Sequence, residues 1–175
     1  AMEMMAGSNR NIKNYDEALN YYFKTLFIEK EMGKDEWIAN TNSRIAKVFI
    51  EKLDYEKAIA FIVQSNLVYS KLKDKAGIAN CEMLKGLIYY KRSDFANSLN
   101  HQLLAKSLFE ALSDSNGLSE VYSNLSKIYY EFGEYNLSMK YAQLCIKLKE
   151  KNSLIENISE DYELLSKTLL KKNDY

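Results

Sequence analysis

The sequence has no proline, and only six of its 175 residues are glycine. These residues are the ones that most often interrupt helices and form tight turns, so their scarcity favours long uninterrupted helices. Charge of one sign is not in excess either, because 24 Lys and Arg residues balance 24 Asp and Glu residues. Such a chain lacks the field that attracts nucleic acid or anionic membranes, so we expect neither as a partner of this segment.

Residue types that perform catalysis or bind metals are also scarce. The chain has a single histidine, His101, and two cysteines, Cys81 and Cys145, whose spacing matches no metal or redox motif. Both cysteines lie in apolar periodic stretches, where small buried residues are expected. Glycine is too sparse for a phosphate-binding loop. We therefore predict that the chain is not an enzyme and that it has no cofactor and no metal site.

Long hydrophobic runs are missing as well. No stretch approaches the roughly 20 apolar residues that cross a bilayer, and residues 1–8 lack the basic start and apolar run of a signal peptide. The compartment stays unknown at this point, with the cytoplasm favoured for this segment. Residues 1–13 are interpreted as a cloning remnant or a truncated repeat, and the chain as an excised fragment of a longer protein.

A short phrase that recurs every forty residues organises the rest of the chain. Its fullest form is the stretch from Leu53 to Ala58, and an aromatic residue stands at each of the positions 15, 55, 95, 135 and 175. A small residue follows three places later wherever the chain continues. Regular spacing of this kind indicates tandem repeats.

Each forty-residue unit contains two stretches with helical periodicity, separated by a short polar turn. Asp54 is predicted to cap the helix that begins at Tyr55. The predicted single array at 14–175 consists of a lone second helix at 14–32, full repeats at about 35–72, 75–112 and 115–151, and a lone first helix at 154–172. Because the loops are short, neighbouring helices must be antiparallel. The sequence therefore predicts an all-α fold of tandem helix-turn-helix repeats.

Residues forty positions apart indicate which side chains pack together. Small residues recur where helices must approach closely, and large aromatic residues recur beside them. One small series is Thr25, Ser65, Ala105 and Cys145; another is Ala46, Gly86, Ser126 and Ser166; the large series is Phe49, Tyr89 and Tyr129. His101 shares its repeat position with Tyr21, Phe61 and Tyr141, which predicts a packing role for the histidine.

This pattern resembles the tetratricopeptide repeat (TPR) family. The third unit matches the family run at Gly86, Tyr89, Asp94, Phe95 and Ser98, and the fourth at Ser126, Tyr129, Gly133, Glu134, Tyr135 and Ser138. The period of forty differs from the usual 34 of the family, no proline ends a unit, and the aromatic that opens the family motif is missing. Forty-residue variants are found in bacterial peptide-sensing regulators, in sensor portions of bacterial kinases and in some eukaryotic scaffolds. The resemblance implies a right-handed α-solenoid and a role in protein–protein interaction.

In this family the first helices line a concave surface that binds ligands. The implied groove residues are Asn40, Ser43, Lys47, Asn80, Met83, Leu87, Tyr90, Glu120, Ser123, Lys127 and Tyr130. Met83, Leu87 and Tyr90 would form an apolar floor between Lys47 and Lys127, which suits a peptide with a central apolar side chain and acidic groups. The alternative is that Met83 and Leu87 simply pack against the next unit. The family's carboxylate clamp for chaperone peptides is missing, because the corresponding slots hold Ser43, Lys47, Leu84, Glu120 and Asn124.

Two functions from different classes follow. The leading prediction is a protein- or peptide-binding scaffold that serves as the sensor or docking region of a larger bacterial signalling or transcriptional regulator. The alternative is a structural spacer or self-association module with no ligand in the groove. The expected partner is a protein or peptide, and a homo-oligomer stays open.

Overall fold

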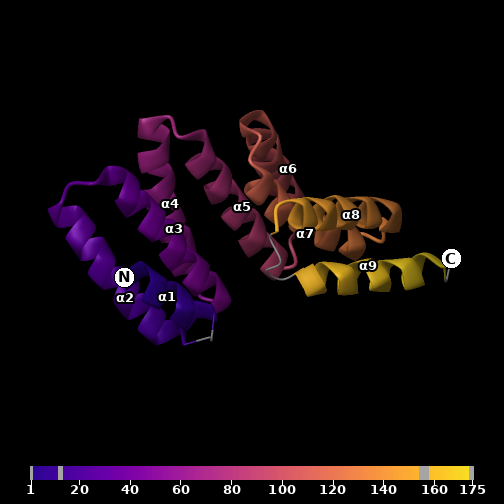
Figure 1. Cartoon of the computed structure of the whole chain (residues 1–175), viewed down its shortest axis with the longest axis horizontal. Coiled ribbons are helices and arrows are strands. Elements are labelled where there is room, and N and C mark those ends of the chain that lie inside the picture. Colours follow the sequence, from indigo (N-terminus) through magenta and orange to yellow (C-terminus); the bar gives the residue numbers. More distant parts are fainter. Residues whose placement is uncertain (1, 12–13, 154–157, 174–175) are drawn as a thin grey trace. The chain divides into compact units, whose positions relative to one another are not determined.

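The computed structural model describes residues 2–11, 14–153 and 158–173, which form nine α-helices and no strand (Figure 1). The helices are α1 (Met2–Asn11), α2 (Tyr15–Glu31), α3 (Asp35–Glu51), α4 (Tyr55–Leu72), α5 (Lys75–Lys91), α6 (Phe95–Leu112), α7 (Ser115–Glu131), α8 (Tyr135–Lys151) and α9 (Ile158–Asn173). The predicted all-α fold is confirmed. Among these helices none is long and apolar enough to cross a membrane.

The turns between helices follow the recurring phrase. The side chain of Asp54 accepts a hydrogen bond from the backbone N–H of Lys57 at 3.2 Å, which confirms the predicted cap of α4. Asp94 caps α6 in the same way, accepting from the N–H of Asn97 at 3.2 Å. The residue before each aspartate has a positive φ, 61° at both Leu53 and Ser93, and this left-handed residue reverses the chain.

The chain divides into two compact units, Ala1–Lys85 and Gly86–Tyr175, with α5 contributing to both. In the first unit α1 packs against α2, α2 against α3, and α3 against α4. In the second unit α6 packs against α7, α7 against α8, and α8 against α9. Helices that pack in chain order against both neighbours are the arrangement of an α-solenoid-like repeat.

The two ends of the predicted array differ from the structure in their boundaries. Residues 2–11 form a helix that packs on α2, so α2 is not a second helix without a partner. The predicted first helix at 154–172 corresponds to α9, although positions 154–157 lie outside the described residues.

The small repeat positions lie in the core, as predicted. Ser65, Ala105 and Cys145 are fully buried, and Thr25 is 9% exposed. The hydroxyls of Ser126 and Ser138 each donate to the other residue's carbonyl oxygen at 2.9 Å, which ties α7 to α8 at a close crossing. Ser166, in contrast, is exposed on α9.

Aromatic rings stack where a first helix meets the following second helix. The ring centroids are 5.7 Å apart for Phe49 and Phe61 and 5.5 Å apart for Tyr129 and Tyr141, with nearly parallel planes. The imidazole of His101 stacks on Tyr89 at 5.2 Å in the same manner. The predicted packing role of His101 is therefore confirmed.

Candidate functional site

A pocket of about 400 Å³ lies in the first unit where α1, α2 and α3 meet. Ligand pockets in proteins typically measure roughly 300–1,000 Å³, so this volume suits a side chain or a small ligand. The lining residues are Met2 from α1, Thr25, Ile28 and Glu29 from α2, Met32 directly after α2, and Trp37 and Asn40 from α3. On α2 these positions are three or four residues apart and therefore lie on one face of the helix.

Two of the equivalent junctions further along the chain are filled by aromatic side chains. Between α4 and α5, Tyr69 packs on Gly77, and a Cβ added to this glycine would lie 2.3 Å from the ring. Between α6 and α7, Phe109 packs on Gly117, where an added Cβ would lie 2.5 Å from the ring. Both rings are buried, at 6% and 4% exposure. A large second-helix residue against a first-helix glycine is thus one way to close this junction.

At the junction between α2 and α3 the large aromatic residue is on the first helix instead of the second helix. Glu29 stands at the position of Tyr69, and Trp37 stands at the position of Gly77. Glu29 is 6% exposed, whereas Trp37 keeps 50% of its surface exposed. At this junction there is no buried ring, and the pocket lies here with both Glu29 and Trp37 in its lining. The sequence signal for this feature is Trp37 at a repeat position that holds glycine in the next two units, a signal that the family's groove positions do not include.

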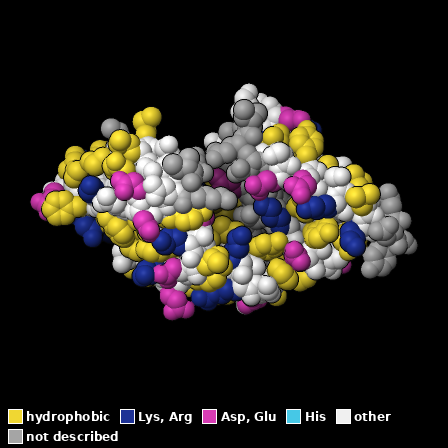
Figure 2. Space-filling model, turned by 90° about the horizontal axis from the view of Figure 1, so that it is seen from below, with side chains coloured by type: hydrophobic (Ala, Val, Ile, Leu, Met, Phe, Trp, Pro, Cys, Tyr) yellow, Lys and Arg dark blue, Asp and Glu magenta, His cyan; other side chains and the backbone are white. Residues whose placement is uncertain are grey.

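The walls of the pocket are apolar and its buried side is polar. Ile28 and Met32 are 42% and 53% exposed. The hydroxyl of Thr41 donates to the Oε1 atom of Glu29 at 3.1 Å. Hydrophobic side chains gather at the left end of the face shown in Figure 2, where α2 ends and α3 begins. The pocket thus offers apolar contact at its rim and a carboxylate at depth.

A polar strip continues from the pocket along α3. Asn40, Arg44 and Lys47 follow Trp37 at spacings of three or four residues, so all four share one helix face. Asn40 is exposed, and Arg44 and Lys47 are half-buried. The Nε atom of Arg44 donates to the Oδ1 atom of Asn40 at 3.2 Å. This strip places amide and basic groups beside an apolar pocket.

Other predicted groove residues of the first unit lie elsewhere. Ser43 is 3% exposed and its hydroxyl is 2.7 Å from that of Ser65, and Met83 is 4% exposed. Neither side chain is on a surface that a ligand could reach, and Asn80 is half-buried. For Ser43 the reason is that α3 packs against both α2 and α4, which buries a wider arc of this helix than the family's groove positions imply. Met83 therefore follows the packing alternative.

In the second unit, the predicted groove residues lie on α5 and α7. Leu87 and Tyr130 are half-buried, and Glu120 is exposed. The hydroxyl of Tyr90 donates to the Oε1 atom of Glu131 at 3.2 Å. Burial, followed by the nearby Glu131 carboxylate, raises the pKa of Tyr90 to about 12. Tyr90 is thus a neutral hydrogen-bond donor between α5 and α7.

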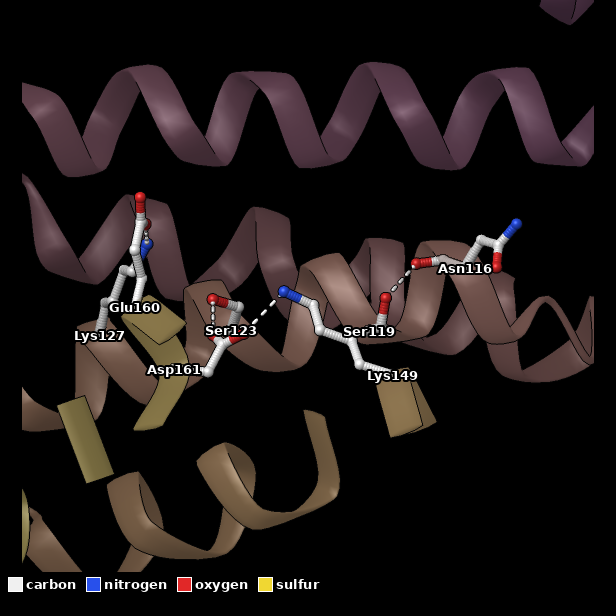
Figure 3. A network of polar contacts seen from close by, with 7 residues as sticks. All are labelled: Asn116, Ser119, Ser123, Lys127, Lys149, Glu160 and Asp161. Carbon is white, nitrogen blue, oxygen red and sulfur yellow. Dashed lines mark hydrogen bonds and ion pairs between the residues drawn. The ribbon is translucent and has the colours of Figure 1, made fainter. Parts of the chain in front are cut away.

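The remaining two predicted residues, Ser123 and Lys127, face α9 (Figure 3). The hydroxyl of Ser123 donates to the Oδ1 atom of Asp161 at 2.6 Å. The Nζ atom of Lys127 lies 3.9 Å from the Oε2 atom of Glu160. These contacts join α7 to α9, so in this structure Ser123 serves helix packing.

Asp161 also forms a buried ion pair with Lys149 of α8. Lys149 reaches its Oδ2 atom at 2.6 Å, and Figure 3 shows the carboxylate between this lysine and Ser123. Two neighbouring carboxylates near the start of a helix usually face solvent, as Glu160 does here, but Asp161 is 2% exposed. Burial, with Asp161 as the next cause, raises the pKa of the Cys145 thiol to about 12. The network holds α9 against α7 and α8.

Comparisons with known proteins support the architecture only. No family model and no curated protein matches the chain. Among solved structures, the crystal structure of BtubC (BKLC) from P. vanneervenii is similar, with a TM-score of 0.75 and 16% sequence identity. The similarity covers 99% of this chain and 72% of that chain. At this identity the likeness shows a shared helical fold, and the tetratricopeptide assignment stays a prediction.

Proposed function

We propose that this chain is a protein- or peptide-binding scaffold of the tetratricopeptide type, and that it is the sensor or docking region of a larger bacterial signalling or transcriptional regulator. The observation that carries the proposal is the exchange of Glu29 and Trp37 at the α2–α3 junction. It leaves a pocket of about 400 Å³ where the α4–α5 and α6–α7 junctions hold a buried ring. The wider assignment to a bacterial regulator rests on the family resemblance.

The chemistry of the pocket indicates which part of a partner it accepts. Trp37, Met32 and Ile28 provide an apolar rim that suits an aliphatic or aromatic side chain. Asn40 carries both a donor and an acceptor, which match the backbone of an extended peptide. Arg44 and Lys47 on the same face of α3 provide basic groups for an acidic residue of that peptide. The apolar anchor point is therefore the α2–α3 pocket, in place of a floor built on Met83.

A displayed library of random peptides, selected on the purified chain, tests this proposal. Trp37 is the only tryptophan, so its fluorescence reports binding at the pocket without a label. We expect selected peptides to change the Trp37 emission on titration. Because Asn40 lines the pocket beside Trp37, we also expect Asn40→Ala to weaken the same peptides about tenfold, a loss of roughly 1.4 kcal/mol.

The decisive variant combines Glu29→Tyr with Trp37→Gly, which copies the Tyr69–Gly77 junction. This double variant should lose binding of the selected peptides in a label-based assay, while Lys30→Gln, an exposed change on the same helix, should not. Peptides that bind the double variant as tightly as the parent chain would show that the pocket is not the site. Loss of binding only with Leu87→Asp and Lys127→Glu would instead locate the site in the second unit.

A further inference from the structure

The α2–α3 pocket has a carboxylate at its buried end. Of the described residues that line the pocket, Glu29 is the one with an ionisable side chain, and it is 6% exposed. Its Oε1 atom accepts a hydrogen bond from the hydroxyl of Thr41 at 3.1 Å. A carboxylate accepts at about four lone-pair sites, so Glu29 can hold Thr41 and further donors at the same time.

Helix packing does not require a carboxylate at this place. Two other junctions hold a buried ring at the repeat position of Glu29, and the α8–α9 junction holds Lys149, which pairs with Asp161 at 2.6 Å. Thr41 stands at the repeat position of Asp161, so a neutral hydroxyl replaces the charged partner there. Burial of a carboxylate costs free energy unless donors compensate it. The α2–α3 junction therefore carries a costly group that the repeat can do without.

The hydroxyl groups near the carboxylate have already used their protons. The hydroxyl of Thr25, which lines the pocket, donates to the carbonyl oxygen of Tyr21 at 3.0 Å, and that of Thr41 donates to Glu29. A hydroxyl has a single proton to donate, so what Thr25 can offer to a ligand is an acceptor oxygen. A ligand group that reaches the buried end therefore meets acceptors and has to bring donors. A carboxylate or phosphate would be repelled there.

The path to this end of the pocket is apolar. Ile28, Met32 and Trp37 line it, and each of them is between 42% and 53% exposed. The Nζ atom of Lys34 lies 5.9 Å from the centroid of the Trp37 ring, which shows that the indole face attracts a cation. Lys34 is itself exposed, whereas Glu29 is buried. Apolar walls that lead to a carboxylate match a side chain with a methylene stem and a cationic head.

From these observations we infer that the α2–α3 pocket accepts the side chain of a lysine or an arginine, whose cationic head donates to Glu29. The inference rests on the proposed function, because it specifies the anchor residue of the peptide that the pocket holds. The aliphatic stem of the anchor lies along Ile28, Met32 and Trp37. An ammonium has three donors and a guanidinium five, and hydrogen bonds between charged groups are about twice as strong as neutral ones. Glu29 is then the residue that determines which side chain enters.

Small analogues of the two side chains test the inference without a selected peptide. Hexylammonium and butylguanidinium carry the two cations, and 1-hexanol is the neutral reference. Trp37 is the only tryptophan, so its indole N–H resonance follows binding at the pocket. We expect dissociation constants in the millimolar range, with at least one cation binding about tenfold more tightly than hexanol. The stronger of the two cations identifies lysine or arginine as the preferred anchor.

The variant Glu29→Gln tests the role of the charge. The glutamine amide has a similar shape and can still accept from Thr41, so we expect hexanol to bind as before and the preference for the cation to disappear. A purely structural role of Glu29 would instead weaken all three probes alike. The matched control is Glu31→Gln, which removes the same charge from an exposed position of α2 and should keep the preference.

Equal affinity of hexanol and both cations in the parent chain would overturn the inference, as would the absence of binding by all three probes. A preference that Glu31→Gln abolishes as fully as Glu29→Gln would overturn it too. The comparison in the parent chain needs no variant, so it decides the matter even if Glu29→Gln does not fold. The proposed function fails by a different result, namely a library that yields no peptide able to change the Trp37 emission. Selected peptides that bind equally well with norleucine in place of each lysine and arginine would uphold the scaffold and overturn the basic anchor.

Discussion

The Nζ atom of Lys149 lies 2.6 Å from the Oδ2 atom of Asp161, and their side chains are 9% and 2% exposed. The two residues are 12 positions apart and join the end of a second helix to the following first helix. Glu29 and Thr41 occupy the same two repeat positions at the α2–α3 junction, and they too form a hydrogen bond. One pair of repeat positions therefore carries a polar contact in each of the two units.

Breaking this ion pair from one side should be costly. Lys149→Met leaves the Asp161 carboxylate buried with the neutral hydroxyl of Ser123 as a hydrogen-bond donor, and an uncompensated buried charge typically costs about 3–5 kcal/mol. We expect the free energy of unfolding to fall by that amount. Urea unfolding monitored by circular dichroism measures it.

Replacing both partners should be far better tolerated. Phe109 and Val121 stand at these positions in the α6–α7 junction, so Lys149→Phe with Asp161→Val copies an arrangement that the chain already uses. An apolar pair of suitable volume is often as stable as a buried ion pair or more stable by about 1–4 kcal/mol. If the double variant were as unstable as Lys149→Met, the ion pair would be contributing net stability that we do not assign to it.

The sequence predicted those features that depend on a repeating pattern. The small residues Ser65, Ala105 and Cys145 could be placed in the core because every unit repeats them, and Asp54 could be placed at a helix start by its own chemistry. The burial of Asp161 was not predicted, although its repeat position is shared with Thr41, Cys81 and Val121, which are all buried. A carboxylate at a buried repeat position needs a compensating partner, and only the structure shows that Lys149 provides it.

The candidate site was predicted only in part. Asn40 does line the pocket, but Ser43 and Met83 are buried, and for Ser43 the cause is that α3 is covered by both α2 and α4. The pocket itself results from exchanging a large and a small residue between two helices. That exchange is visible only when Glu29 and Trp37 are compared with the pair that replaces them at the next junction.

The close contact of Phe109 with Gly117 leads to a further prediction. A Cβ at position 117 would lie 2.5 Å from the ring, so Gly117→Ala must displace a buried aromatic side chain. We expect it to lower the free energy of unfolding by about 1–3 kcal/mol, although alanine is otherwise the better helix former. Thermal unfolding measures the loss.

Gly7 provides the matched control for this substitution. It lies in α1, and a Cβ there would meet nothing within 4 Å. Gly7→Ala should therefore leave stability unchanged or raise it by up to about 1 kcal/mol. Equal destabilisation by the two alanines would show that the Phe109 contact is not what requires glycine at position 117.

Alkaline pH should destabilise the fold through its two thiols. Burial raises the pKa of Cys81 to about 11 and that of Cys145 to about 12, from an ordinary value of 9.0. Above pH 9 the unfolded chain releases these protons while the folded chain retains them, so stability is complete below pH 9 and falls as the pH rises toward the folded values. Urea unfolding midpoints at about pH 8, 9 and 10 should decrease in that order.

The variant Cys81→Ala, Cys145→Ala separates the thiols from other groups. Its midpoint should fall less steeply between pH 9 and 10 than that of the parent chain, with the remaining slope arising from tyrosines such as Tyr90, whose pKa is also raised. Parallel pH profiles for the two proteins would exclude the thiols as the cause. In the folded parent chain, neither cysteine should react with a thiol reagent at about pH 8, because both are buried and protonated.

The last prediction concerns the stability of the α2–α3 junction. Trp37→Gly alone should destabilise the chain for two reasons. It introduces a glycine into a helix, and it removes an indole side chain that is 50% exposed and therefore half-buried against its neighbours. Adding Glu29→Tyr should restore about 1–3 kcal/mol, since the ring can then lie on the new glycine as Tyr69 lies on Gly77. Glu29→Tyr without the glycine should bring no such gain, because the Cβ of Trp37 would then collide with the ring, as a Cβ at Gly77 would collide with Tyr69. The gain is therefore expected to depend on both changes together, and a double-mutant cycle of urea unfolding measures this coupling. Strict additivity of the two changes would mean that the size exchange at this junction is not the origin of the pocket.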